Sequence, residues 1–144
     1  MKIQLFASGA LAFGGVILMG MGLYFAILRP PLLPEDLRYM GASLAQIQTA
    51  MPGLAPWLAR VFGVLGGYMF ATGLLTVYVA ATGFRTVRLG AIAVVSVSGL
   101  ASIGWMTVAN FAIGSDFKWL LFLFALPWVA ALALSSVGER KVQQ

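Results

Sequence analysis

Four long stretches of the chain carry no charged residue, and they set the predicted architecture. They cover residues 5–28, 61–84, 89–113 and 119–138. A bilayer hydrocarbon core of ~30 Å is crossed by a helix of ~20 apolar residues, so each stretch is long enough to span it. The first stretch also exceeds the ~7–15 apolar residues of a signal peptide, so we expect it to remain as a span.

Short links between the last three stretches predict how the spans are arranged. Helices joined by so few residues lie next to each other and run in opposite directions. We therefore expect residues 1–144 to form a single all-α domain, an integral membrane four-helix bundle with up-down-up-down topology.

The connector between the first and second spans has a different pattern. Pro34 suits the first position of a helix, and Glu35 and Asp36 suit its positive N-terminal end. Apolar residues then recur at steps of three and four, at Leu37, Met40, Leu44, Ile47 and Met51. This spacing predicts one amphipathic helix over residues 34–51, lying at the membrane interface or over the mouth of the bundle, with Glu35 on its polar face.

Composition narrows the possible functions further. The chain is 61% hydrophobic and 9% charged, whereas a soluble domain carries about 25% charged residues. The net charge of +5 comes from basic residues that flank the spans, which is typical of membrane topology determinants. We therefore expect contact with membrane lipids and exclude a soluble enzyme and a nucleic-acid binder.

The chain has no histidine and no cysteine, which excludes disulfides, thiolate nucleophiles, Cys/His zinc sites and histidine-ligated haem. None of its four acids lies within a predicted span. Glu35 and Asp36 are adjacent, so on a helix they point in different directions and form no catalytic pair. We expect no metal and no cofactor, and an enzyme is the least favoured interpretation.

The basic residues also bear on orientation. Five of them, Lys2, Arg85, Arg88, Arg140 and Lys141, fall on the side that carries both termini, and four, Arg29, Arg38, Arg60 and Lys118, fall on the other. The positive-inside rule then favours a multi-pass protein of the cell membrane with both termini in the cytoplasm. So small a difference leaves reversed or dual insertion open.

A stripe of small residues marks the second span. Ala59, Gly63, Gly67 and Ala71 recur every four positions, which makes one face of a helix flat and lets another backbone approach it. We interpret this stripe as a helix-packing surface, either within the bundle or against a second protein chain.

Polar residues in the third span are the candidates for ligand contact. Ser98 and Ser102 are four residues apart and share a helix face, although hydroxyls can also bond a carbonyl of the preceding turn. Asn110 is the best single candidate, because its amide satisfies itself less easily.

Aromatic residues gather toward the side of the long connector, where an aromatic belt at headgroup depth is expected. The alternative is an aromatic cup beneath the amphipathic helix that holds an apolar guest, with Tyr39 and Trp57 as contacts. Trp105 and Trp128 lie deeper in their spans and are more typical of core residues. Trp105 is nevertheless a candidate ligand contact.

The sequence RVFGVLGGYMFATGLL at residues 60–75 is similar to the glycine-rich second span of the small DoxX-like membrane proteins. The layout of one span, a long connector and three closely linked spans resembles that family too. The proline-rich stretch 30–41 departs from it. Some members resemble accessory subunits of quinol oxidases, and the resemblance implies no catalytic residue.

Two functional hypotheses follow. The first is a small non-catalytic membrane protein that serves as an accessory subunit or self-associating scaffold, as a homo-oligomer or beside a partner membrane subunit. The alternative is a binder or conduit for an apolar small molecule, such as a lipid, sterol or quinone.

Overall fold

A computed structural model describes residues 2–82 and 89–140. The predicted link with Arg85 and Arg88, the end of the predicted second span, and Lys141 lie outside the described residues. Helices contain 88% of the described residues, and this part of the chain has no strand. The all-α fold class is therefore confirmed.

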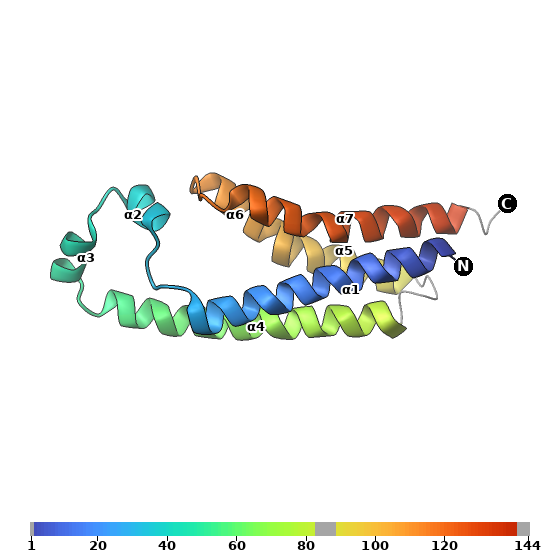
Figure 1. The fold of residues 1–144 in the computed structure, drawn as a ribbon, viewed down its shortest axis with the longest axis horizontal. Coiled ribbons are helices and arrows are strands. Elements are labelled where there is room, and N and C mark those ends of the chain that lie inside the picture. Colours follow the sequence, from blue (N-terminus) through green and yellow to red (C-terminus); the bar gives the residue numbers. More distant parts are fainter. Residues whose placement is uncertain (1, 83–88, 141–144) are drawn as a thin grey trace.

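The helices follow one another along the chain as Figure 1 shows, some of them ending or continuing in a wider π-helical turn. Their bounds are α1 (Lys2–Leu23), the π turn η1 (Tyr24–Leu28), α2 (Pro34–Met40), α3 (Leu44–Ala50), α4 (Leu54–Thr82), α5 (Leu89–Gly99), the π turn η3 (Leu100–Gly104), α6 (Trp105–Ala112) and α7 (Lys118–Arg140).

Four helical segments are long and apolar enough to cross a membrane: Lys2–Leu28, Leu54–Thr82, Gly90–Ala112 and Lys118–Ser136. They correspond to the four predicted spans. The second starts earlier than predicted, because Pro56 fits within the first helical turn, where no backbone N–H is needed. At 29 residues, α4 is about 43 Å long, so it extends beyond the ~30 Å hydrocarbon core and places Arg60 near its start.

A glycine seam joins α1 to α4. Gly15 faces Gly73, and Gly22 faces Gly66, so closely that a Cβ on Gly66 would lie 2.5 Å from the Gly22 carbonyl oxygen and from the Ala26 nitrogen. In each helix the two glycines are seven residues apart, and the pairing is antiparallel. Such spacing keeps one narrow face of each helix on its neighbour. The two helices lie side by side in Figure 1.

Trp128 fixes the other side of α1. Its ring is 3% exposed and lies between Gly14 of α1 and Gly99 of α5, where an added Cβ would come within 2.7 Å and 2.6 Å of it. This confirms the interpretation of Trp128 as a core residue. The surrounding core cluster consists of Ala7, Leu11, Leu18, Ala80, Val95, Ile103 and Ala131.

The prediction of a single amphipathic helix over residues 34–51 is wrong. The structure has two short helices, because Gly41 adopts a left-handed conformation (φ 65°) that ends α2, as glycine commonly does at a helix C-terminus. Ser43 then starts α3 with a reciprocal capping box: its Oγ accepts from the Gln46 N–H, and its own N–H donates to Gln46 Oε1. Glu35, predicted on a polar face, is buried.

Candidate functional site

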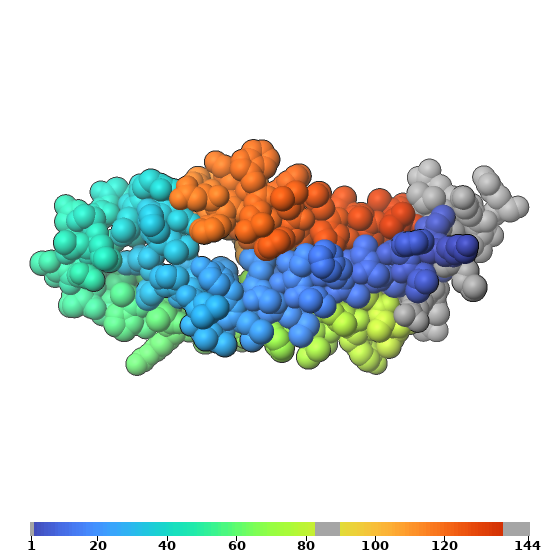
Figure 2. Space-filling model, viewed as in Figure 1, coloured from blue at the N-terminus to red at the C-terminus, as the bar shows by residue number. Residues whose placement is uncertain are grey.

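A cavity of about 900 Å³ lies between α1, α4 and the α6–α7 pair, beside α2. The space-filling view shows the surface hollowed between the end of α1, α2 and the α6–α7 corner (Figure 2). Several lining residues that are also strongly exposed flank its opening, among them Leu65, Tyr68 and Trp105. The cavity is therefore open sideways, toward the region that lipid would occupy.

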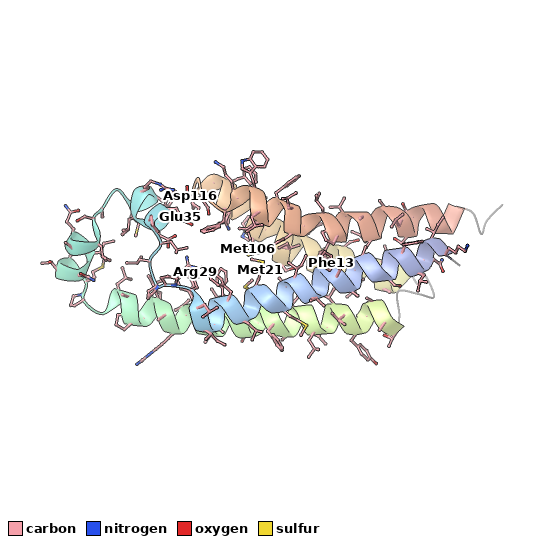
Figure 3. All side chains as sticks on the ribbon, in the orientation of Figure 1. Phe13, Met21, Arg29, Glu35, Met106 and Asp116 are labelled. Carbon is pink, nitrogen blue, oxygen red and sulfur yellow. The ribbon has the colours of Figure 1, made fainter. Side chains whose placement is uncertain are left out.

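Apolar side chains form most of the cavity wall. Met21 of α1, Met69 of α4 and Met106 of α6 contribute flexible thioethers from three different helices; Met21 and Met106 are labelled in Figure 3. Phe25 and Phe124 add aromatic surface. Methionine adapts to irregular shapes, so such a wall suits a long, flexible apolar guest.

Both π-helical turns contribute to the cavity wall. The turn η1 provides Tyr24 and Phe25, and η3 provides Ala101 and Ser102. A π turn inserts one extra residue into the helical ladder and recurs at functional sites. Here the two turns lie on helices on opposite sides of the same space.

The polar end of the cavity lies where the first span ends and α2 begins. Arg29 donates through Nη2 to Asp36 Oδ2 (3.2 Å) and through Nη1 to the carbonyl of Pro30 (2.9 Å). Its guanidinium carbon lies 3.7 Å from the ring centroid of Phe62, a close cation–π contact. Asp36 in turn accepts from the N–H of Leu33. Arg29 and Asp36 therefore form a fixed, largely sheltered ion pair.

Glu35 is the buried acid of this end. Glu35 is only 3% exposed and lines the cavity. Ser115, in the α6–α7 turn, donates its hydroxyl to Glu35 Oε1 (3.2 Å), while the same hydroxyl oxygen accepts from the N–H of Phe117 (3.1 Å). The serine proton is thereby directed at the carboxylate, and α2 is tied to the α6–α7 turn.

A second, exposed tie joins the same two segments. Arg38 of α2 donates to Asp116 Oδ1 at 2.7 Å. The hydrogen bond and the charge of Asp116 raise the pKa of Arg38 above its usual value, so the arginine stays charged over the whole neutral range. In Figure 3, Glu35 and Asp116 lie close together beside α2.

The structure brings three of the six predicted ligand contacts to the cavity. Asn110, Ser102 and Trp105 line it. Ser98, Tyr39 and Trp57 do not line this cavity: Ser98 is half-buried on α5, and the other two are strongly exposed. Trp105 is itself 70% exposed, so it is a residue of the rim, whereas Trp128 fills the core.

The polar side chains of the third span bond to their own helix. Ser102 donates to the Ser98 carbonyl (2.6 Å), and Thr107 donates to the Ile103 carbonyl (2.8 Å). The amide nitrogen of Asn110 also donates to its own helix, to the Met106 carbonyl (2.9 Å), so the expectation that this amide satisfies itself poorly is wrong for its donor.

The stripe of Ala59, Gly63, Gly67 and Ala71 does not pack against another described helix. An added Cβ on Gly63 or Gly67 would meet no described atom within 4 Å. The interpretation of these two glycines as packing residues within the bundle is therefore wrong. The close approach is made by Gly66 and its partners on α1, as described above. An antiparallel pair of helices keeps its contact face at a repeat of seven residues, which the four-residue stripe does not follow.

Sequence reasoning missed the methionines and Glu35 as cavity residues. No sequence pattern marks the methionines, because they come from three different helices. For Glu35 a signal existed: it is one of only four acids in the chain, and it follows the proline that starts a helix.

No family model, no curated protein and no solved structure matches this chain. The comparisons therefore add nothing to the resemblance to the DoxX-like proteins. The inference of function depends on the geometry of the cavity.

Proposed function

We propose that this chain is a four-span membrane protein with up-down-up-down topology that binds a long apolar molecule with a polar head. The observation that carries this proposal is the cavity of about 900 Å³, which is within the size range of small-molecule sites, ~300–1,000 Å³. Its wall is mostly apolar along the helices, where the hydroxyls of Thr72 and Ser102 bond to their own helix, and its charged residues lie at one end.

The position of the polar end supports an amphiphile. Arg29 directly follows the first span, and Glu35 belongs to the connector, so both lie where the membrane interface is expected. The methionines lie further along the helices, at hydrocarbon depth. A bound molecule with its head near Glu35 and its chain beside Met21 and Met106 would be oriented like a lipid of the same leaflet.

The test is native mass spectrometry of the protein extracted in mild detergent. We expect mass adducts of a lipid-like molecule on the wild-type chain, and we expect their loss from Met21→Trp/Met106→Trp, whose two indoles occupy cavity volume. The control is Phe13→Trp, which adds an indole on the exposed surface of α1, outside the cavity. Equal adducts on all three folded proteins, or none on the wild type, would refute the proposal.

A second candidate function is an accessory subunit or self-associating scaffold. The observation that favours it is the outward-facing small-residue stripe of α4, on which Gly63 and Gly67 meet no other helix. The DoxX-like layout is consistent with this function. Gly63→Leu/Gly67→Leu should then lower the oligomeric mass measured in native lipid. A wild-type chain that is strictly monomeric and purifies without a partner would argue against it.

We also propose a multi-pass protein of the cell membrane with both termini in the cytoplasm. The support is the basic side chains near the termini and the position of the start of α1 and the end of α7 at the same end of the molecule (Figure 1). A reporter fused to the C-terminus tests this orientation, and activity of a reporter that works only outside the cytoplasm would contradict it.

A further inference from the structure

The residues at the polar end of the cavity differ in which of their acceptor oxygens are already used. The Arg29 guanidinium already donates to Asp36 and to the Pro30 carbonyl and covers the ring of Phe62. Asp36 Oδ2 accepts from both Arg29 and the N–H of Leu33. The charges of this pair offset each other, and the accepting oxygen Asp36 Oδ2 is already used twice, although three N–H groups of Arg29 can still donate.

Glu35 and Asn110 are in the opposite situation. Within residues 2–82 and 89–140, Ser115 is the one hydrogen-bond donor to the Glu35 carboxylate, and it reaches Oε1. Asn110 donates one of its two amide N–H groups to the Met106 carbonyl, and its amide oxygen accepts no hydrogen bond within the same residues. Both residues line the cavity, so each has an oxygen that can accept from a bound molecule.

The charges point the same way. Arg29 and Asp36 cancel each other, so the remaining charged group at the cavity's polar end is the Glu35 carboxylate. A buried acid with a single neutral donor carries a desolvation cost that a cationic partner would relieve. A carboxylate or phosphate head would instead be placed beside a like charge.

From these contacts we propose that the cavity takes a single-chain amphiphile whose head is an ammonium group, held by Glu35 Oε2 and the Asn110 amide oxygen. This inference rests on the proposed function and names the ligand class of the same site. A charge-assisted hydrogen bond is about twice as strong as a neutral one. The ammonium head is therefore preferred over a neutral hydroxyl head, and both over a carboxylate head.

The experiment compares three probes with the same sixteen-carbon chain: hexadecylamine, hexadecanol and hexadecanoate. They compete at equal concentration for the detergent-solubilised full chain, and native mass spectrometry measures the bound share of each. We expect the amine to bind about tenfold more tightly than the carboxylate, the equivalent of ~1.4 kcal/mol.

Glu35→Gln isolates the charge, because a glutamine oxygen still accepts from Ser115 and keeps α2 in place. We expect this variant to lose the preference for the amine. Asp116→Asn is the matched control: it removes one negative charge from the same region but at an exposed position outside the cavity, and it should keep the preference.

The outcomes separate this inference from the function on which it rests. If hexadecanoate binds as well as the amine, or Asp116→Asn acts as Glu35→Gln does, the ammonium assignment is overturned. Provided that Met21→Trp/Met106→Trp still abolishes binding, the cavity then remains a binding site. If that double variant binds every probe as the wild type does, both proposals are overturned.

Discussion

Replacing Gly66 with alanine should force α1 away from α4, because the added Cβ would collide with backbone atoms rather than with a side chain that can move. The Cβ would lie 2.5 Å from the Gly22 oxygen and 2.5 Å from the Ala26 nitrogen, whereas ordinary contact starts at 3.4 Å. The two helices must therefore separate by about 1 Å at this point, where the packing of protein interiors tolerates little change.

The magnitude follows from two opposing effects. Overpacking of this kind costs ~1–3 kcal/mol, and the exchange of glycine for alanine in a helix returns up to ~1 kcal/mol. Gly67→Ala makes the same exchange one residue away, but its Cβ meets nothing within 4 Å. Gly67→Ala should therefore be neutral or slightly stabilising. The difference in unfolding free energy between the two variants should be about 1–3 kcal/mol, the cost of the collision alone.

Thermal unfolding of both variants in the same detergent, at a protein concentration where the chain is monomeric, measures this difference. We expect a lower melting temperature for Gly66→Ala and an unchanged or higher one for Gly67→Ala. If Gly67→Ala destabilises the protein as much as Gly66→Ala does, the assignment of the contact face of α4 is wrong.

Other variants test the remaining contacts. Trp128→Ala should lower the unfolding free energy by ~3–5 kcal/mol, because it empties a buried site. Trp105→Ala, at a residue 70% exposed, should change the unfolding free energy by less than ~0.5 kcal/mol. Unfolding of the two variants in detergent compares these effects. Ser115→Ala should cost ~1–3 kcal/mol, because the buried carboxylate beside it loses its donor. Added salt should weaken the exposed Arg38–Asp116 tie and speed hydrogen exchange in α2. Raising the pH within the neutral range should leave the protection of α2 unchanged once the intrinsic pH dependence of amide exchange is divided out, since the raised pKa of Arg38 keeps its contribution until the pH passes that value.

The number and approximate position of the spans could be predicted from the sequence, because burial in lipid requires long uncharged helices, and such stretches are visible without knowledge of tertiary contacts. The ends of the spans follow less directly from the sequence. Arg60 limits the apolar stretch but not the helix, since a charged side chain near a helix end can extend to the interface. The second spanning helix, α4, therefore begins at Leu54.

The helix contacts could not be predicted in the same way. Both a four-residue and a seven-residue repeat of small residues are present in the second span, and choosing between them requires the position of α1. Similarly, the apolar spacing of the connector predicts one helix, because the same spacing continues through α2 and α3. The left-handed Gly41 ends α2 and the capping box of Ser43 starts α3, so the chain forms two helices instead.

The cavity itself arises from how the helices diverge. At the middle of the spans, Trp128 fills the space between Gly14 and Gly99, and the helices are closely packed there. Toward the connector, the seam from Gly15 to Gly22 keeps α1 on α4, while no described side chain as large as Trp128 lies between α1 and α6, where the cavity opens. The space between them is enclosed by methionines and closed at one end by α2, which is itself held by buried and exposed ties to the α6–α7 turn.

A segment held in this way can yield when those ties are broken, so loss of Ser115 and Asp116 together should speed ligand exchange more than loss of either one. Competition between unlabelled and deuterated hexadecylamine, followed over time by native mass spectrometry, measures that rate. An unchanged rate in the double variant would show that molecules enter through the lateral opening beside Trp105 instead.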